Sequence, residues 1–238
     1  SIFFRDPFHK KLRIPYYVYM QSFIPESPTM RAYFEKRGQR LEYDKRQTLE
    51  RADDPQPWVY YLEDGIVEAS YSFPDGVDRM LGYFIPRSIF AQNRSFFDDA
   101  GGDLKYITIT KTTILRVHRD DFLKQVAKVP KFNQEYLQMA LLFRIFTTDL
   151  VIYLGENRIH NRCVRWLMLM ARYYGEQTDE GTRIMVPLTQ DTIANFLHVS
   201  RESISKTLRE FTKGGHISIR KKQITIKDVS ALKDLLEY

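Results

Sequence analysis

The sequence predicts an α+β fold in three parts: an N-terminal β-roll, a long helix and a C-terminal winged helix-turn-helix. The roll is expected as a double-stranded β-helix, because short β-rich runs separated by turn signals fill residues 38–118. An apolar pattern with heptad spacing follows Pro130 and predicts one long helix. After about residue 157 the pattern changes to helix, short strand, two helices, hairpin and helix. The expected parts are residues 1–128, 129–156 and 157–238.

The composition is typical of a soluble globular protein. Its 238 residues suffice for one large or two ordinary domains with real cores. The formal net charge is +6 and the pI is near 9.2, which is compatible with a polyanionic partner but is also common among enzymes. Cys163 is the single cysteine, so an internal disulfide and an all-cysteine metal site within one chain are excluded.

No segment is expected to cross a membrane. The longest mostly apolar stretch, residues 139–154, is interrupted by Arg144 and Asp149 and falls short of the roughly 18 residues that a span needs. The first residues lack the charged-then-apolar order of a secretory signal, and the chain starts with Ser1 rather than Met, which indicates a trimmed or processed terminus. We therefore expect a cytoplasmic protein, in agreement with the low cysteine content.

The β-rich part is divided by two Asp-Gly turn signals. Residues 63–65 separate runs at 58–62 and 66–73, and residues 74–76 separate the second run from one at 80–85. Asp-Gly between apolar runs indicates a hairpin, because Gly and Asp tolerate the positive φ that tight turns require. The other expected elements here are strands at 106–110 and 113–118 and one or two helices packed on the roll within the first 37 residues.

The long helix carries two apolar sets. A second set at Leu137, Leu141, Leu142, Ile145 and Ile152 lies elsewhere on the helix from the heptad set. One face could pack on the chain's own domain and the other on a twin helix, which predicts a homodimer; alternatively, both form one wide stripe in a monomer core. The heptad positions, with spacing 4 and 3, are expected on the dimer helix: Phe132, Tyr136, Met139, Phe143, Phe146, Leu150 and Tyr153.

Residues 188–211 have the layout of a helix-turn-helix. They follow a helical stripe from Ile159 to Tyr174 and a strand expected at 183–186. Thr189 can cap the first helix, residues 197–200 form the turn, and Ser200 can cap the second helix. The expected inward positions are Ile193, Ala194, Phe196 and Leu197 on the first helix and Ile204, Leu208 and Phe211 on the second.

The outward face of the second helix has residue types that read DNA bases. Arg201 near the helix start can pair with the O6 and N7 atoms of guanine, and Glu202 can accept a hydrogen bond from the N4 amino group of cytosine. Lys206 and Ser205 stand about one turn later, and Arg209 follows. The alternative is an ordinary solvated helix face. Because the whole arrangement matches a recognition helix, we expect Arg201, Glu202, Ser205 and Lys206 to read bases.

A β-hairpin wing is expected after the second helix. Alternating apolar residues at 217–219 and 224–226 flank a basic tip at 220–222. Cations at a hairpin tip suit phosphate contacts and would make DNA affinity depend on salt, although charge runs are often merely solvated. The expected DNA-backbone contacts are Thr189, Gln190, Ser200, Ser203, Arg209, Lys221 and Lys222.

Residues 188–194 and 200–208 carry a resemblance to the Crp/Fnr superfamily of bacterial regulators, and the similarity spans nearly the whole chain. The resemblance implies a cyclic-nucleotide-binding-type β-roll, a long dimer helix and a winged helix-turn-helix that reads DNA through Arg201, Glu202 and Lys206, with Ser205 used by some members. Two positions depart from the family. Lys206 stands where Arg is commoner, which puts bidentate guanine reading there in doubt. His198 replaces the Gly that is frequent in the turn, and His tolerates the positive φ of this position better than β-branched residues do, but at some cost.

The effector predicted from the sequence is not cyclic AMP. Family members that bind cyclic nucleotides carry a Gly-Glu pair and an Arg-Ser-Ala stretch, whereas residues 89–93 and 104–106 here read Ile-Phe-Ala-Gln-Asn and Leu-Lys-Tyr. The ribose and phosphate would lose their charge-assisted contacts. The N-terminal cysteine cluster of oxygen-sensing members is absent, and the five histidines show no ligand-like pairing for haem or a metal. We therefore expect no cofactor and no metal.

The expected pocket is rich in aromatic residues and would hold an aromatic or otherwise apolar anion. In this respect the chain resembles the halogenated-phenol-sensing members of the family. The alternatives are that these aromatics only fill the core of the roll, that the effector is a peptide thiol, or that there is none. The expected lining is Arg79, Tyr83, Phe90, Gln92, Asn93, Tyr106, Tyr136 and Phe143.

The sequence thus predicts a transcription regulator that binds an inverted-repeat operator as a homodimer under the control of a small molecule. RNA polymerase is a further expected partner. An enzyme is not expected, because no nucleophile elbow, Walker loop, dinucleotide fingerprint or metal-ligand spacing occurs in the chain. The remaining alternative is a constitutive DNA-binding regulator whose β-roll is only a scaffold.

Overall fold

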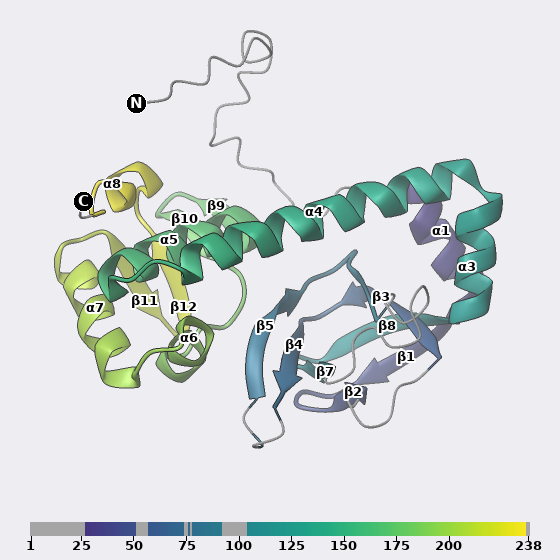
Figure 1. The fold of residues 1–238 in the computed structure, drawn as a ribbon, viewed down its shortest axis with the longest axis horizontal. Coiled ribbons are helices and arrows are strands. Elements are labelled where there is room, and N and C mark those ends of the chain that lie inside the picture. Colours follow the sequence, from purple (N-terminus) through teal and green to yellow (C-terminus); the bar gives the residue numbers. More distant parts are fainter. Residues whose placement is uncertain (1–26, 51–56, 74–75, 77, 92–103, 237–238) are drawn as a thin grey trace, which may run out of the picture.

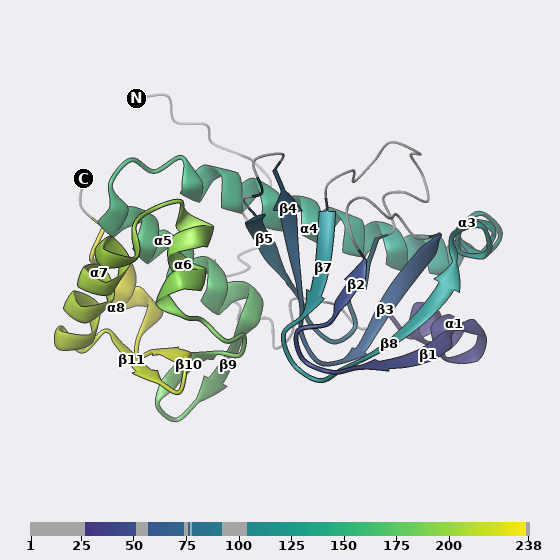
Figure 2. The same ribbon diagram turned by 90° about the horizontal axis from the view of Figure 1, so that it is seen from below.

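A computed structural model describes residues 27–50, 57–73, 76, 78–91 and 104–236. Two compact units lie along one long helix, with the β-roll beneath one half of the helix and the C-terminal unit at its other end (Figure 1). The strand β5 is the part of the roll nearest to the C-terminal unit in both views (Figures 1 and 2).

The roll consists of two four-stranded antiparallel sheets, with strand orders β1-β8-β3-β6 and β2-β7-β4-β5. Aromatic side chains fill the space between the sheets, including Tyr60, Phe90 and Tyr106, which are all buried. The strands are β1 (Gln39–Tyr43), β2 (Thr48–Glu50), β3 (Trp58–Asp64), β4 (Val67–Ser72), β5 (Asp78–Phe84), β6 (Ile89–Phe90), β7 (Leu104–Thr108) and β8 (Thr112–His118).

Only one of the two expected Asp-Gly hairpins forms. The runs on either side of residues 74–76 are β4 and β5, which pair as an antiparallel hairpin. The turn at Asp64-Gly65, however, carries the chain from one sheet to the other, because β3 and β4 lie in different sheets. Gly65 has φ 96°, and a Cβ atom there would lie 2.5 Å from the Oγ1 atom of Thr112. The positive-φ turn was predicted correctly, but the hairpin there was wrong, because a local signal does not specify which strand becomes the neighbour.

Two short helices close the far end of the roll. The helix α1 (Pro28–Arg37) agrees with the helix expected in the first 37 residues, and α3 (Arg119–Lys128) was not predicted. The carboxylate of Glu135 accepts hydrogen bonds from the backbone N–H of Met30 at 2.9 Å and of Thr29 at 3.3 Å. A buried acidic side chain of the long helix therefore caps the N-terminus of α1.

The long helix α4 (Pro130–Leu154) has its heptad face turned inward, which corrects the predicted dimer face. Phe132 and Met139 belong to the core between the roll and the helices α1, α3 and α4, and Phe146 and Leu150 belong to the core of the C-terminal unit. Contacts within the chain therefore bury the set that was assigned to the dimer: Phe132, Met139, Phe146 and Leu150 are buried, and Tyr136, Phe143 and Tyr153 are partly buried.

Most of the second apolar set instead faces solvent, and only Leu142 is partly buried, against the core of the C-terminal unit. Leu137, Leu141, Ile145 and Ile152 are 53%, 55%, 42% and 60% exposed. By length and composition alone α4 is apolar enough to cross a membrane, with a mean hydropathy of 1.5 in an 18-residue window, although a single helix of this kind is weak evidence for a span. A helix that packs against its own chain passes the same test, and α4 contacts both units.

The C-terminal unit has a four-stranded sheet of order β11-β12-β10-β9 packed against helices (Figure 2). The strand expected at 183–186 lies at 181–184, and its partner β9 was not predicted. The elements are α5 (Ile159–Tyr174), β9 (Gly175–Thr178), β10 (Gly181–Ile184), α6 (Gln190–Leu197), α7 (Arg201–Lys213), β11 (Ile217–Arg220), β12 (Gln223–Ile226) and α8 (Val229–Lys233).

Candidate DNA interface

Both helices of the helix-turn-helix begin at the predicted capping residues. The Thr189 hydroxyl accepts a hydrogen bond from the backbone N–H of Thr192 at 3.0 Å. The Ser200 hydroxyl accepts one from the backbone N–H of Ser203 at 3.2 Å. Each cap satisfies a donor that the first turn of a helix leaves unpaired. The start of α7, where base-reading residues are expected, is therefore fixed locally.

The turn between the helices contains a left-handed residue, as its family position predicted. His198 has φ 56°, and its backbone N–H donates to the carbonyl oxygen of Asn195 at 3.4 Å. A non-glycine residue in this conformation costs roughly 1–2 kcal/mol. Partial burial lowers the pKa of His198 below its ordinary value, and the positive charges of Arg79 and Arg162 lower it further.

The two helices share one core and are braced from α5. Ile204, Leu208 and Phe211 on α7 are buried, as predicted. Arg162 of α5 donates to the carbonyl oxygen of Leu197 at 3.0 Å and to that of Glu156 at 2.8 Å. The last turn of α6 is therefore tied to the segment that joins α4 to α5, and α6 and α7 pack in one core.

The outward face of α7 presents the predicted side chains to solvent. Arg201, Glu202, Lys206 and Arg209 are exposed, and Ser205 is partly exposed. The Nε atom of Arg201 lies 3.4 Å from the Oδ1 atom of Asp191 on α6, in an exposed ion pair that sequence reasoning did not identify. Exposed pairs contribute little to stability, so Arg201 remains available to a ligand. The structure thus brings the expected base readers together on one accessible helix face.

The wing hairpin forms with its basic tip exposed. Both tip residues have left-handed backbones, with φ 48° at Lys221 and 67° at Lys222, as in a type I′ turn. The carbonyl oxygen of Lys222 accepts a hydrogen bond from the backbone N–H of Leu188 at 2.8 Å. This bond ties the wing to the residue that precedes the Thr189 cap. The lysines were predicted at a hairpin tip, but the strained backbone beneath them was not.

The remaining predicted backbone contacts surround this face. Thr189 and Gln190 at the start of α6 are partly exposed, and Ser200 at the start of α7 is exposed. The Ser203 hydroxyl lies 2.9 Å from that of Ser200, so the two hydroxyls are already paired with each other. These residues, together with the wing, border the exposed side of α7.

The expected effector pocket does not form as one site. Phe90 and Tyr106 pack against each other inside the roll, with ring centroids 5.2 Å apart. Phe84 stacks on Phe90 at 5.0 Å and contacts Phe143 of α4 at 5.5 Å. These aromatics therefore fill the core, which is the alternative left open above. Tyr136 lies elsewhere on α4, with its ring 5.5 Å from that of Phe122.

Two further members of the expected pocket, Arg79 and Tyr83, lie on β5, at the side of the roll that meets the C-terminal unit. Neighbouring residues on a strand face opposite sides, so Tyr83 faces outward where Phe84 packs inward. The Tyr83 hydroxyl donates to the carbonyl oxygen of Pro187 at 3.4 Å, in the C-terminal unit. Arg79 lies near His198 in the same contact region. Arg79 and Tyr83 therefore lie apart from the aromatic interior of the roll. Gln92 and Asn93 lie outside the described residues.

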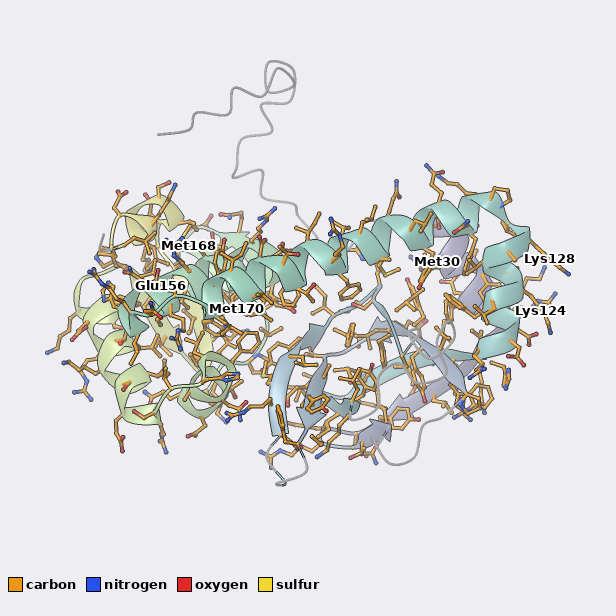
Figure 3. The ribbon with its side chains drawn as sticks, in the orientation of Figure 1. Met30, Lys124, Lys128, Glu156, Met168 and Met170 are labelled. Carbon is orange, nitrogen blue, oxygen red and sulfur yellow. The ribbon has the colours of Figure 1, made fainter. Side chains whose placement is uncertain are left out.

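A hollow of about 550 Å³ lies at the far end of the roll, where no pocket was predicted. It lies among α1, α3 and the end of β8, and Lys124 and Lys128 are on the outer side of α3 (Figure 3). Arg116 also lines it, with its guanidinium 4.2 Å from the centre of the Trp58 ring. Within the described part of the chain, no group of three His, Cys, Asp or Glu side chains is placed to hold a metal ion.

Known proteins match the chain over both units. The family model described as "Cyclic nucleotide-binding domain" matches residues 40–128, and "Crp-like helix-turn-helix domain" matches residues 161–235. The chain is 25% identical over 205 residues to the CRP-like cAMP-activated global transcriptional regulator of Mycobacterium tuberculosis, covering 86% of this chain and 91% of that protein. It is 26% identical over 221 residues to the global nitrogen regulator of a Synechocystis species, covering 89% and 97%.

Solved structures with the same fold include CprK complexed with OCPA, at a TM-score of 0.70 and 16% identity, covering 90% of this chain and 96% of that one. A CooA mutant from Carboxydothermus hydrogenoformans also gives 0.70, at 18% identity, covering 85% and 89%. The regulators matched in sequence are not enzymes. The two family models together cover both the roll and the helix-turn-helix, and the chain belongs to the Crp/Fnr family of DNA-binding transcription regulators.

Proposed function

We propose that this regulator reads an inverted-repeat operator as a homodimer, with α7 in the major groove and a small molecule other than cyclic AMP as its effector. The observation that carries the DNA part is the exposed face of α7, where Arg201, Glu202 and Lys206 project from a helix capped at Ser200. Such a helix presents its N-terminal side chains to base edges while the preceding helix rests on the backbone.

Each side chain has a distinct proposed role. Arg201 donates to guanine O6 and N7, and Glu202 accepts from the N4 amino group of cytosine. Lys206 makes a third base contact and Ser205 an optional fourth. The proposed phosphate contacts are the partly or fully exposed residues around this helix and the wing: Thr189, Gln190, Ser200, Ser203, Arg209, Lys221 and Lys222.

The exposed apolar side of α4 supports the homodimer. At 100° per residue, Leu137, Leu141, Ile145 and Ile152 fall within about 80° of one another around the helix. A face this apolar and this exposed is unfavourable in water unless a partner covers it. We assign the dimer contact to this face rather than to the heptad set. A two-fold dimer can read two half-sites when its two α7 helices lie about 34 Å apart.

The effector is the least specified part of the proposal. The absent Gly-Glu and Arg-Ser-Ala residues support an effector other than cyclic AMP, although one relative is named as cAMP-activated. The aromatic interior of the roll and the likeness to CprK complexed with OCPA support an aromatic or apolar anion. A roll that is only scaffold is the second candidate, favoured by the packed state of Phe84, Phe90 and Tyr106.

We further propose a working division at residues 1–128, 129–156 and 157–238, action in the cytoplasm, and RNA polymerase as a partner at the promoter. Selection of binding sites from a pool of random duplexes tests the core of the proposal. The full chain should enrich an inverted repeat whose half-sites are centred about one DNA turn apart. Enrichment of single half-sites only, or of no sequence, would contradict it. A thermal-shift screen of aromatic acids, phenols, nucleotides and glutathione would then separate sensor from scaffold.

A further inference from the structure

The edge of the roll that faces the C-terminal unit has its backbone groups bound by side chains of that unit. The strand β5 is last in the order β2-β7-β4-β5, so its outer edge has no neighbouring strand in its sheet. The unpaired N–H and C=O groups of an edge strand must find other partners when they are covered. Here the C-terminal unit supplies them.

Asn195 of α6 occupies one part of this edge. Its Nδ2 amide donates to the carbonyl oxygen of Asp78 at 3.2 Å, and its Oδ1 atom accepts from the backbone N–H of Met80 at 3.3 Å. A carboxamide offers one donor and one acceptor side by side, as a peptide group does. Asn195 therefore binds residues i and i+2 of β5 much as an adjacent strand would.

Tyr174, the last residue of α5, occupies the next part of the edge. Its hydroxyl donates to the carbonyl oxygen of Tyr83 at 3.0 Å and accepts from the backbone N–H of Tyr83 at 3.3 Å. The Tyr174 side chain is buried, and its ring meets the ring of Tyr83 edge-on at 6.1 Å. The two units pack closely here, because a Cβ atom on Gly82 would already be in van der Waals contact, 3.4 Å from the Phe146 ring and 3.6 Å from the Tyr174 hydroxyl.

The covalent chain joins the roll to the C-terminal unit through α4, and these hydrogen bonds form a second connection between the two units. The segment after α4 begins at Gly155, the C-cap residue of that helix. Beyond it, α6 and α7 pack in one core, so contacts that fix the position of α6 also fix the position of α7. The orientation of the recognition helix relative to the roll is therefore set at two places, the end of α4 and the edge of β5.

We propose that Asn195 and Tyr174 are positioning residues for DNA recognition: they fix the helix-turn-helix to the β5 edge of the roll. A shift of β5 within the roll is then passed to α7 directly, in addition to any movement of α4. The role of these residues in DNA recognition rests on the base-reading function proposed above. Their role in fixing the orientation of the two units does not depend on that function, so the two roles can be tested separately.

Distances between paired spin labels on the two units give the direct test. Cys163 is buried, so cysteines introduced at the exposed residues Lys45 and Lys213 would take the labels selectively. Labelled chains diluted with unlabelled protein report distances within one chain. The variant combines Asn195→Ala with Tyr174→Phe, which keeps the ring and removes its hydroxyl. The matched control is Asn133→Ala, on α4 and outside the contact.

We expect one narrow distance distribution for the wild type and the control, and a clearly broadened one for the double variant without DNA. An unchanged distribution in the double variant would overturn the proposal. The ratio of affinities for the selected operator and for a random duplex should fall about fivefold or more, with the melting temperature held within a few degrees. A broadened distribution with an unchanged ratio would refute the role in recognition. Failure of base reading would instead show as a ratio near one in the wild type, with the distances unaffected.

Discussion

The two lysines at the tip of the wing have a strained backbone and are also proposed to contact phosphates. One double substitution tests both properties. Lys221 and Lys222 both have left-handed backbones, which cost roughly 1–2 kcal/mol each for residues other than glycine. Asn-Gly is the preferred pair for a type I′ turn of this shape. Replacing Lys221 with Asn and Lys222 with Gly should relieve most of that strain, against about 0.5–1 kcal/mol of extra backbone entropy for the glycine. We expect a net gain of about 1 kcal/mol in the free energy of unfolding.

The same change removes two cations from the proposed phosphate contacts. If both lysines release counterions, the slope of log affinity against log salt should become shallower by about 1.8, at about 0.9 for each phosphate neutralised. The variant should therefore be more stable, by a few degrees in melting temperature, and bind all DNA sequences more weakly.

Thermal unfolding measures the change in stability. Fluorescence anisotropy measures DNA affinity at salt concentrations from about 50 to about 300 mM, a range over which the screening length changes about twofold. The control replaces Lys45 and Lys131 with Gln, which removes the same charge from exposed sites on the roll and α4. An equal loss of salt slope in the control would refute the phosphate contact. Unchanged or lower stability in the tip variant would refute the strain.

Two further predictions concern the buried groups of the fold. Glu135→Ala should lower the free energy of unfolding by about 2–3 kcal/mol, because the N-terminus of α1 loses a charged acceptor. Glu135→Gln should lower it less, because the amide oxygen can still accept a hydrogen bond. Urea titration measures both changes, and equal losses would contradict the role of charge. Burial raises the pKa of the Cys163 thiol to about 12, so the native protein should resist iodoacetamide at pH 8, where a free thiol with pKa near 8.5 reacts. Mass spectrometry that found rapid native alkylation would contradict this environment.

The features that could be predicted from the sequence are those fixed by a few neighbouring residues. The caps at Thr189 and Ser200 and the left-handed His198 depend on local hydrogen bonds and backbone sterics, and all three formed as expected. The apolar positions Ile204 and Leu208 follow the helical period, which is also local.

The features that failed depend on which segments meet in space. Both sides of α4 are apolar, so the sequence alone could not tell which side packs within the chain and which is exposed. Tyr83 was assigned to a pocket because it lies among aromatic residues in sequence, but the side that faces inward is set by the packing of Phe84. The pairing of β3 with β8, and not with β4, is likewise a tertiary choice.

A double-mutant cycle between protein and DNA tests base reading by the recognition helix most directly. The affinities of the wild type and Arg201→Ala are measured on the selected operator and on the same operator with the contacted guanine replaced in both half-sites. The replacement should cost the wild type about 1–3 kcal/mol per half-site and should cost Arg201→Ala almost nothing further. An equal penalty in both proteins would mean that Arg201 does not read that base, and the proposed role of α7 would fail.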